Sequence, residues 1–310
     1  MKKIALITGS GVLGAYLAKE LIKKKYKVYV TSRYLKKNYR NYDYLKISKR
    51  IRFLKLNILS KNEIKKIITK IKPEMIFYFS GQSSLVKSLK FSKKTFESNC
   101  LGVKNFLEII YDNNYNINFF KANSGYIFES KSGVISLNSK LSKSKNPYIK
   151  AQIKAYHLIK KFRQRGIKCH NIVMLQVESP LRNNNFFIKK VCFHAKRGKK
   201  IKVGNVNSVR DYCWASEIAL GIYYFSQSNM KDIILSSGIG LSGKDILNEA
   251  YKLNKLNSKK YYQVHKKYLR QKEIKILIGN DQNVKKLYNQ FKWKIKINGK
   301  KIIESMYRSI

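Results

Sequence analysis

Two tyrosines in the segment NPYIKAQIKAYHLIKKF, residues 146–162, are candidates for proton transfer. A tyrosine hydroxyl gives up its proton more readily when a cation lies beside it and lowers its pKa. Residues four apart lie on one face of a helix, and Lys160 follows Tyr156 at that spacing, whereas Tyr148 is followed by Gln152. One tyrosine therefore has a lysine partner, and the other has an amide, which supplies no charge.

The elements that would position these side chains alternate through the first half of the chain. Short apolar runs such as KIALITG, KVYVTSR and EMIFYFSG alternate with helical patterns such as AYLAKELIKKK and KNEIKKIITKI. That alternation is typical of βαβ units and a parallel sheet. We therefore predict an α/β fold with a Rossmann-type doubly wound parallel sheet in residues 1–172. Residues 173–310 are predicted to form mainly a smaller substrate-binding lobe, with a return to the sheet near 216–240.

Three glycines follow the first apolar run in a G-x-G-x-x-G motif: Gly9, Gly11 and Gly14. Glycines at this spacing let a pyrophosphate approach the backbone at the positive end of a helix. Because the motif lies inside a βαβ pattern, it predicts a dinucleotide-binding turn that also includes Val12 and Leu13.

The end of the second predicted strand indicates which dinucleotide binds. The run VTSR places Ser32 and Arg33 where an acidic residue would hold the ribose 2′-hydroxyl of NAD. Serine and arginine instead suit a 2′-phosphate, so the sequence favours NADP over NAD.

Charge, hydropathy and cysteine content narrow the functional classes. The net charge is +49, but lysines occur in nearly every segment without a nucleic-acid-binding motif, so we expect no nucleic-acid partner. No apolar run approaches the roughly 20 residues that span a bilayer, and we expect no membrane association. The cysteines have no metal-ligand spacing, so we expect no metal and reduced thiols in a cytoplasm; they are Cys100, Cys169, Cys192 and Cys213.

Several stretches together resemble the extended short-chain dehydrogenase/reductase superfamily and, within it, the GDP-mannose 4,6-dehydratase family. The likeness rests on FYFSGQSSLVKS, FESNCLGVKNFLE, VESPLRNNNFFIKK, VGNVNSVRDYCWASEIALGIY and EIKILIGN, and it runs from end to end of the chain. The resemblance implies an NADP-dependent lyase and a homo-oligomer acting on a GDP-linked nucleotide sugar. Its reaction would be oxidation at C4, loss of water across C5 and C6, and return of hydride to C6.

The resemblance also assigns the catalytic positions. Tyr148 lies 24 residues after Ser124 and matches the family tyrosine, which takes the proton from a sugar hydroxyl, while the serine binds the same sugar oxygen. The family has a lysine where this chain has Gln152. The pair Tyr156 and Lys160 lies two turns deeper in the helix and is interpreted as a coincidence in a lysine-rich chain.

Two of these catalytic positions depart from the family pattern. Gln152 can hydrogen-bond a ribose but cannot lower the pKa of Tyr148 by charge. Tyr126 stands two residues after Ser124, where the family has a glutamate that assists the loss of water. We therefore expect slow or altered turnover, and we expect the substitution Gln152→Lys to raise sugar oxidation at neutral pH.

Further positions follow from the resemblance alone. Those implied to bind the cofactor are Asn57, Ile58, Ser80, Gly81, Gln82, Asn99 and Glu178. Those implied to bind the substrate are Ser83, Ser179, Arg182, Lys189, Asn205, Arg210, Arg270 and Glu273. The arginines suit a diphosphate because the planar guanidinium group donates two parallel hydrogen bonds.

Two other functions stay open at this point. A nucleotide-sugar reductase or C4 epimerase of the same superfamily is one, because the glutamate replaced by Tyr126 separates dehydration from these reactions. A diverged, non-catalytic nucleotide-sugar binding protein is the other, because two catalytic positions differ at once.

Overall fold

The structure is a computed structural model that describes residues 3–35, 39–269 and 273–310. It divides into two compact units, each built from segments distant in the sequence. The first unit consists of Met1–Phe128, Lys140–Val173 and Ile222–Ile233, and the second of Glu129–Ser139, Met174–Gly221 and Ile234–Ile310.

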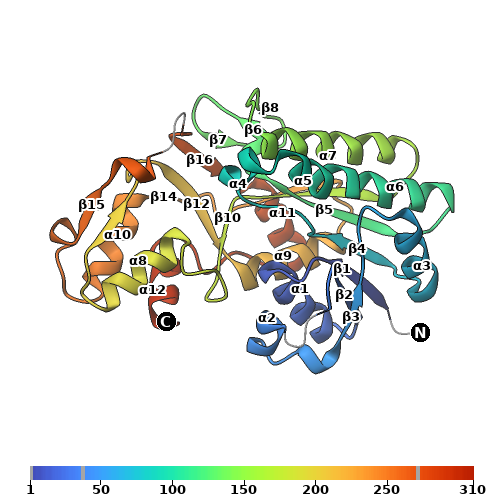
Figure 1. Cartoon of the computed structure of the whole chain (residues 1–310), viewed down its shortest axis with the longest axis horizontal. Coiled ribbons are helices and arrows are strands. Elements are labelled where there is room, and N and C mark those ends of the chain that lie inside the picture. Colours follow the sequence, from blue (N-terminus) through green and yellow to red (C-terminus); the bar gives the residue numbers. More distant parts are fainter. Residues whose placement is uncertain (1–2, 36–38, 270–272) are drawn as a thin grey trace. The chain divides into compact units, whose positions relative to one another are not determined.

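A seven-stranded, mostly parallel sheet forms the centre of the first unit (Figure 1). Its strands lie in the order β13-β9-β5-β4-β1-β2-β3. The strands are β1 (Ile4–Thr8), β2 (Lys27–Ser32), β3 (Ile51–Lys55), β4 (Met75–Tyr78), β5 (Asn118–Ser124), β9 (Cys169–Met174) and β13 (Asp232–Leu235). Strands β1 to β5 pair in parallel, so the residues that follow them gather at one edge of the sheet. The predicted α/β Rossmann-type fold is confirmed.

Helices cover both faces of this sheet. On one face, α3 (Lys61–Ile71), α6 (Gly102–Asp112) and α7 (Pro147–Gln164) share an apolar core with strand residues such as Leu6 and Phe119. On the other face, α1 (Val12–Lys23) lies close to Ile7, which alternates with Leu6 along β1. This two-sided covering explains why the strands are apolar throughout rather than alternating.

The second unit has its own sheet and core. The strands β10 (Gln176–Glu178), β12 (Val209–Trp214), β16 (Ile276–Gly279) and β7 (Val134–Ile135) lie in that order, and β14 (Gly240–Ser242) pairs antiparallel with β12. A second ladder joins β11 (Ile201–Val203) to β15 (Tyr262–Val264). Three helices, α8 (Phe187–Lys196), α10 (Gly243–Lys252) and α12 (Lys300–Arg308), pack around a separate apolar core.

The remaining elements are short or peripheral. They are α2 (Arg40–Tyr44), α4 (Leu85–Lys90), α5 (Ser92–Phe96), a π-helical turn at Glu97–Leu101, β6 (Phe128–Glu129), β8 (Lys140–Leu141), α9 (Ala215–Ser226) and α11 (Gln282–Phe291), with 3₁₀ turns at Ser48–Arg50, Gly125–Ile127, Ser258–Lys260 and Lys266–Tyr268. Among the described residues, no helix is both long enough and apolar enough to cross a bilayer.

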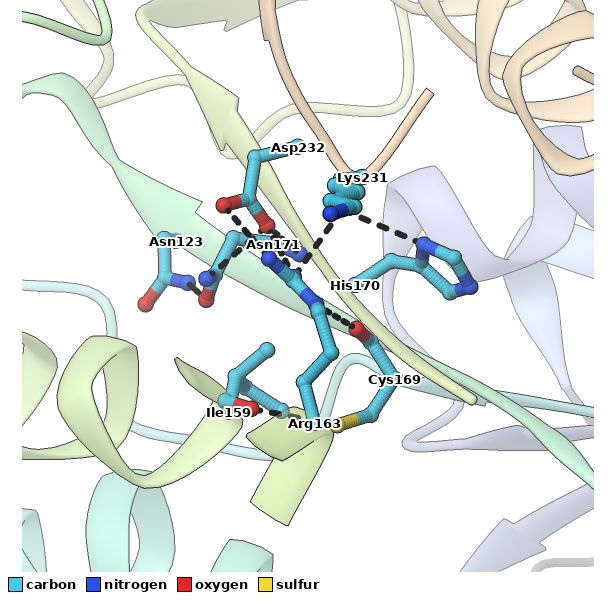
Figure 2. Close-up of polar contacts among 8 residues, drawn as sticks. All are labelled: Asn123, Ile159, Arg163, Cys169, His170, Asn171, Lys231 and Asp232. Atoms are coloured by element: carbon cyan, nitrogen blue, oxygen red, sulfur yellow. Dashed lines mark hydrogen bonds and ion pairs between the residues drawn. The ribbon is translucent and has the colours of Figure 1, made fainter. Parts of the chain in front are cut away.

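A polar network anchors the C-terminal half of α7 to the sheet (Figure 2). The guanidinium group of Arg163 pairs with both carboxylate oxygens of Asp232 and donates through Nε to the carbonyl of Cys169 at 2.8 Å. Asp232 also accepts from the backbone and side-chain amides of Asn171, whose Oδ1 accepts from Asn123 at 2.6 Å. Because this network ties α7 to β9 and β13, it fixes which face of the helix meets the sheet.

We expect Asp232→Ala to destabilise the first unit by about 2–4 kcal/mol, because it leaves a largely buried arginine without its counter-charge. Urea unfolding should show the loss. Lys104→Ala is the matched control, since it removes an exposed ion pair with Glu108 from the same unit and should change stability by less than about 0.5 kcal/mol. Equal effects of the two substitutions would show that the network is not the anchor.

Candidate active site and cofactor-binding site

The glycine turn after β1 has the backbone geometry of a phosphate-binding loop. Gly9 has a φ of +88°, and a Cβ there would lie 3.2 Å from the carbonyl oxygen of Phe79. A Cβ on Gly14 would lie 2.9 Å from the carbonyl oxygen of Gly9, whereas one on Gly11 meets nothing within 4 Å. No side chain caps the start of α1 at Val12. The open side of Gly11 and the uncapped helix N-terminus fit a dinucleotide pyrophosphate.

The strand ends beside this turn carry several of the expected cofactor residues. The backbone N–H of Gly9 donates to the carbonyl of Thr31 at 3.0 Å, which holds the turn against the end of β2. Ser32 is half-buried there and Arg33 is exposed. Asn57 follows β3, and its side-chain oxygen accepts from Leu59. Ile58, by contrast, places its side chain in the apolar core, so that side chain stabilises the fold.

The loop after β4 is held by Asn99, which lies in the π-helical turn. Asn99 donates through Nδ2 to the carbonyls of Gln82 and Thr95 at 3.1 and 3.0 Å. Gly81 has a φ of +151°, and a Cβ there would clash with the Asn99 side chain. Ser80 donates its backbone N–H to Thr8 Oγ1 at 3.3 Å. The conformation of this loop therefore depends on Gly81 and on the Asn99 amide. Ser83, further along the loop, is exposed.

Tyr148 lies in the first turn of α7, with 8% of its surface exposed. The helix begins with Asn146 as its N-cap, which accepts from the backbone N–H of Tyr148 at 3.0 Å, followed by a proline. Burial raises the pKa of the Tyr148 hydroxyl. Hydrogen bonds from Ser124 and Gln152 oppose that rise in pKa, and the nearby Tyr126 adds to it. The structure thus brings together the four residues expected to be catalytic.

A lysine that the sequence analysis did not single out completes this cluster. Lys121, in β5, is 1% exposed and donates from Nζ to Gln152 Oε1 at 3.1 Å. Gln152 in turn donates from Nε2 to Asn99 Oδ1 at 3.0 Å. The signal was present in the run INFFKANSG: Lys121 is two residues from Phe119, so strand alternation places both side chains on the face covered by α7.

Tyr156 has a different environment from Tyr148. Its ring is 2% exposed and packs edge-on against Phe128 at 5.6 Å. Lys160 Nζ lies over the ring face, 4.7 Å from the centroid. Burial raises the pKa of Tyr156 to about 12, and the negative charge of Asp232 contributes to the rise. This geometry describes a core tyrosine with a cation stacked on its ring rather than an activated phenol.

In the second unit, four expected ligands lie in or around the loop after β10. Burial raises the pKa of Glu178 to about 7, and the charges of Arg182 and Lys189 oppose the rise. Lys189 Nζ donates to the carbonyls of Pro180 and Arg182 at 2.6 and 2.8 Å. The Arg182 guanidinium stacks on Phe186, 3.3 Å from the ring centroid. Ser179 Oγ accepts a hydrogen bond from the backbone N–H of Leu181 at 2.9 Å.

A second group of expected substrate residues surrounds β12. Arg210 is buried, donates to the carbonyl of Val209 at 2.7 Å and lies 3.6 Å from the Glu273 carboxylate. Asn205 is exposed, and its side-chain oxygen accepts from the backbone of Asn207. Arg270 lies outside the described residues. In this unit, therefore, Arg210 and Glu273 form an ion pair.

Two solved structures with this fold are nucleotide-sugar enzymes. The dTDP-glucose 4,6-dehydratase from Bacillus anthracis in complex with NAD has a TM-score of 0.84 at 15% identity, covering 99% of this chain and 96% of that one. The UDP-glucose 4-epimerase from Thermus thermophilus in complex with NAD has a TM-score of 0.83 at 17% identity, covering 99% and 98%. The fold is that of the extended short-chain dehydrogenase/reductase class.

Sequence comparison narrows the class to a family. The model of the GDP-mannose 4,6 dehydratase family matches residues 6–306, and the chain belongs to that family. GDP-mannose 4,6 dehydratase 1 of Arabidopsis thaliana is 24% identical over 98% of this chain and 89% of its own length. The human GDP-mannose 4,6 dehydratase is 22% identical over 98% of this chain and 90% of its own length.

Proposed function

We propose that this chain is an NADP-dependent enzyme that oxidises the sugar of a GDP-linked nucleotide sugar at C4 and then removes water across C5 and C6. The observation that carries the proposal is the buried Tyr148 hydroxyl, hydrogen-bonded by Ser124 and Gln152 in the unit that holds the glycine turn. Family membership and the nucleotide-sugar enzymes that share the fold support it. The family resemblance also favours a homo-oligomer in the cytoplasm, and sedimentation would test the assembly.

In this proposal the chain's residues bind the cofactor and handle the sugar proton. The glycine turn and the start of α1 hold the pyrophosphate, and Ser32 and Arg33 hold the 2′-phosphate. NADP, when bound, supplies hydride acceptance and return. Tyr148 takes the proton of the sugar hydroxyl, and Ser124 holds the oxygen of that hydroxyl in place.

A ketosugar reductase or C4 epimerase is the second candidate function. Tyr126 favours it, because a phenol stands where the family has the glutamate that assists dehydration, and this phenol interacts with Tyr148. Because a phenol supplies no carboxylate at this position, the base expected to assist the loss of water is missing.

The experiment that separates these functions follows products by mass, using purified chain, either NADP or NADPH, and a panel of nucleotide sugars that includes GDP-mannose and a 4-keto sugar. Loss of water identifies a dehydratase, and gain of two hydrogens identifies a reductase. An isomer of unchanged mass identifies an epimerase. Tight binding without any product would contradict all three activities and identify a binding protein.

We expect NADP to bind more tightly than NAD and Arg33→Ala to weaken NADP binding by about tenfold or more, because a charged hydrogen bond to the 2′-phosphate is lost. Isothermal titration with both cofactors measures this. Arg50→Ala is the matched control: Arg50 is also exposed, but it precedes β3 and so lies at the amino end of the parallel strands, whereas Arg33 follows the carboxyl end of β2. Equal affinities of the unaltered chain for NAD and NADP would refute the NADP assignment.

A further inference from the structure

We propose that Lys121, on strand β5, takes over the role of the lysine missing at position 152 and acts on the Tyr148 hydroxyl through Gln152. Lys121 is then a positioning residue, which reaches the reacting phenol by way of an amide. The kinetic part of this inference rests on the proposed function, whereas the coupling of Lys121 to Tyr148 does not.

The orientation of the Gln152 amide is fixed from two sides. Asn99 uses its Nδ2 group on two backbone carbonyls, so its Oδ1 needs a donor, and Gln152 Nε2 supplies it at 3.0 Å. Lys121 needs an acceptor, and Gln152 Oε1 supplies it at 3.1 Å. The amide therefore presents N–H, and not oxygen, to Tyr148, and an N–H donor favours the ionised phenol.

Among the described residues, the groups that face the Lys121 amine supply no counter-charge, and Gln152 links that amine to Tyr148. Three side chains face the amine: the Tyr78 ring from β4, the Cys100 thiol from the π-helical turn, and Gln152 from α7. The Lys121 Nζ atom lies 5.9 Å from the centroid of the Tyr78 ring. The amine also donates a hydrogen bond to the carbonyl of Ala122. Burial raises the pKa of the Cys100 thiol, although lysines including Lys154 and Lys121 oppose the rise, so the thiol supplies no counter-charge near neutral pH.

The two groups can share one proton. Burial lowers the pKa of Lys121 to about 7, and burial raises that of Tyr148. Above that pH, a charged Lys121 with an ionised Tyr148 holds as many protons as the neutral pair, so the fraction of this reactive form does not change with pH. Without Lys121, ionised Tyr148 must come from loss of a proton to solvent, and its fraction rises tenfold with each pH unit.

The kinetic test measures single-turnover oxidation of the nucleotide sugar against pH in Lys121→Met. The unaltered chain should show a rate that levels off above about pH 7. The variant should be slower by about 10- to 1000-fold at pH 7.5 and approach the unaltered chain toward pH 10, since the ionised fraction of Tyr148 then rises about tenfold with each pH unit. Lys150→Met, which removes an exposed lysine from α7, is the control and should leave the profile unchanged.

A rescue variant separates this proposal from a general packing defect. Lys121→Met combined with Gln152→Lys returns a cation to the helix position and should restore the plateau near neutral pH. The contact between Lys121 and Gln152 changes the expectation for Gln152→Lys alone, because the new ammonium would face the buried amine of Lys121. We expect that single variant to be slower than the unaltered chain.

A second readout needs no turnover. With tyrosine labelled at 13Cζ and the Tyr148 signal assigned by its absence in Tyr148→Phe, that signal should shift with a midpoint near pH 7 as Lys121 titrates. The step should vanish in Lys121→Met. It should also vanish in Gln152→Leu, which removes the amide that connects Lys121 to Tyr148 by hydrogen bonds. The step should persist in Lys150→Met. A step that is absent from the unaltered chain, or that survives Lys121→Met, overturns the inference. A step present in a chain that converts no sugar supports the coupling and refutes only the proposed function.

Discussion

Tyr148→Phe should reduce single-turnover cofactor reduction by about 10²- to 10⁴-fold, the usual contribution of a positioned proton-transfer group. The phenol is hydrogen-bonded to Ser124 and Gln152, and phenylalanine keeps the ring while removing the group that accepts the sugar proton. Cofactor affinity should change little, because the glycine turn and the strand ends that hold the dinucleotide are untouched. Stopped-flow absorbance of the reduced nicotinamide, with a nucleotide sugar established by the product panel, provides the measurement.

Tyr156→Phe is the matched control for that experiment. It also removes a tyrosine hydroxyl from α7, but two turns later. There the ring lies in the core against Phe128, and Lys160 stacks on its face. Its rate should stay within the same order of magnitude as that of the unaltered chain. If Tyr156→Phe abolishes reduction and Tyr148→Phe does not, the proton passes through Tyr156, and the assignment of Tyr148 is wrong.

Lys121→Met should also change how stability depends on pH, by about 4 kcal/mol between pH 6 and pH 10. Burial lowers the pKa of Lys121 from 10.5 to about 7 in the folded chain. Between these values the unfolded chain binds a proton that the folded chain does not, so the contribution of Lys121 to stability rises with pH. That contribution is fully present above the unfolded pKa and is lost as the pH falls through about 7. Each pH unit across this window is worth about 1.4 kcal/mol.

The measurement is the free energy of unfolding of the first unit in urea at several pH values. Methionine leaves Gln152 Oε1 without its donor, a cost of about 1–3 kcal/mol at every pH. The informative quantity is therefore the difference between variant and unaltered chain as a function of pH: the variant should gain relative stability as the solution becomes more acidic. Lys150→Met corrects for the altered net charge. Parallel curves for Lys121→Met and the unaltered chain would show that the lysine is solvated or already neutral.

Local patterns in the sequence were sufficient to predict the Rossmann-type sheet and the glycine turn. Apolar runs alternate with helical patterns along the first half, and a parallel sheet buried on both faces needs that arrangement. The Gly9–Gly14 turn was predictable because a positive φ and close backbone approaches are properties of single residues and their neighbours.

Contacts between distant segments decided the rest. The family resemblance identified Gln152 as a lost lysine, but it could not show that an amine returns from β5, because residues 121 and 152 are brought together only when α7 packs on the sheet. The same packing buries Tyr156 and gives Lys160 a ring face instead of a hydroxyl. Glu129–Ser139 joins the second unit because β7 pairs with β16, far away in sequence. Periodicity specifies which face of an element is buried, whereas the partners of that face depend on how the elements pack in three dimensions.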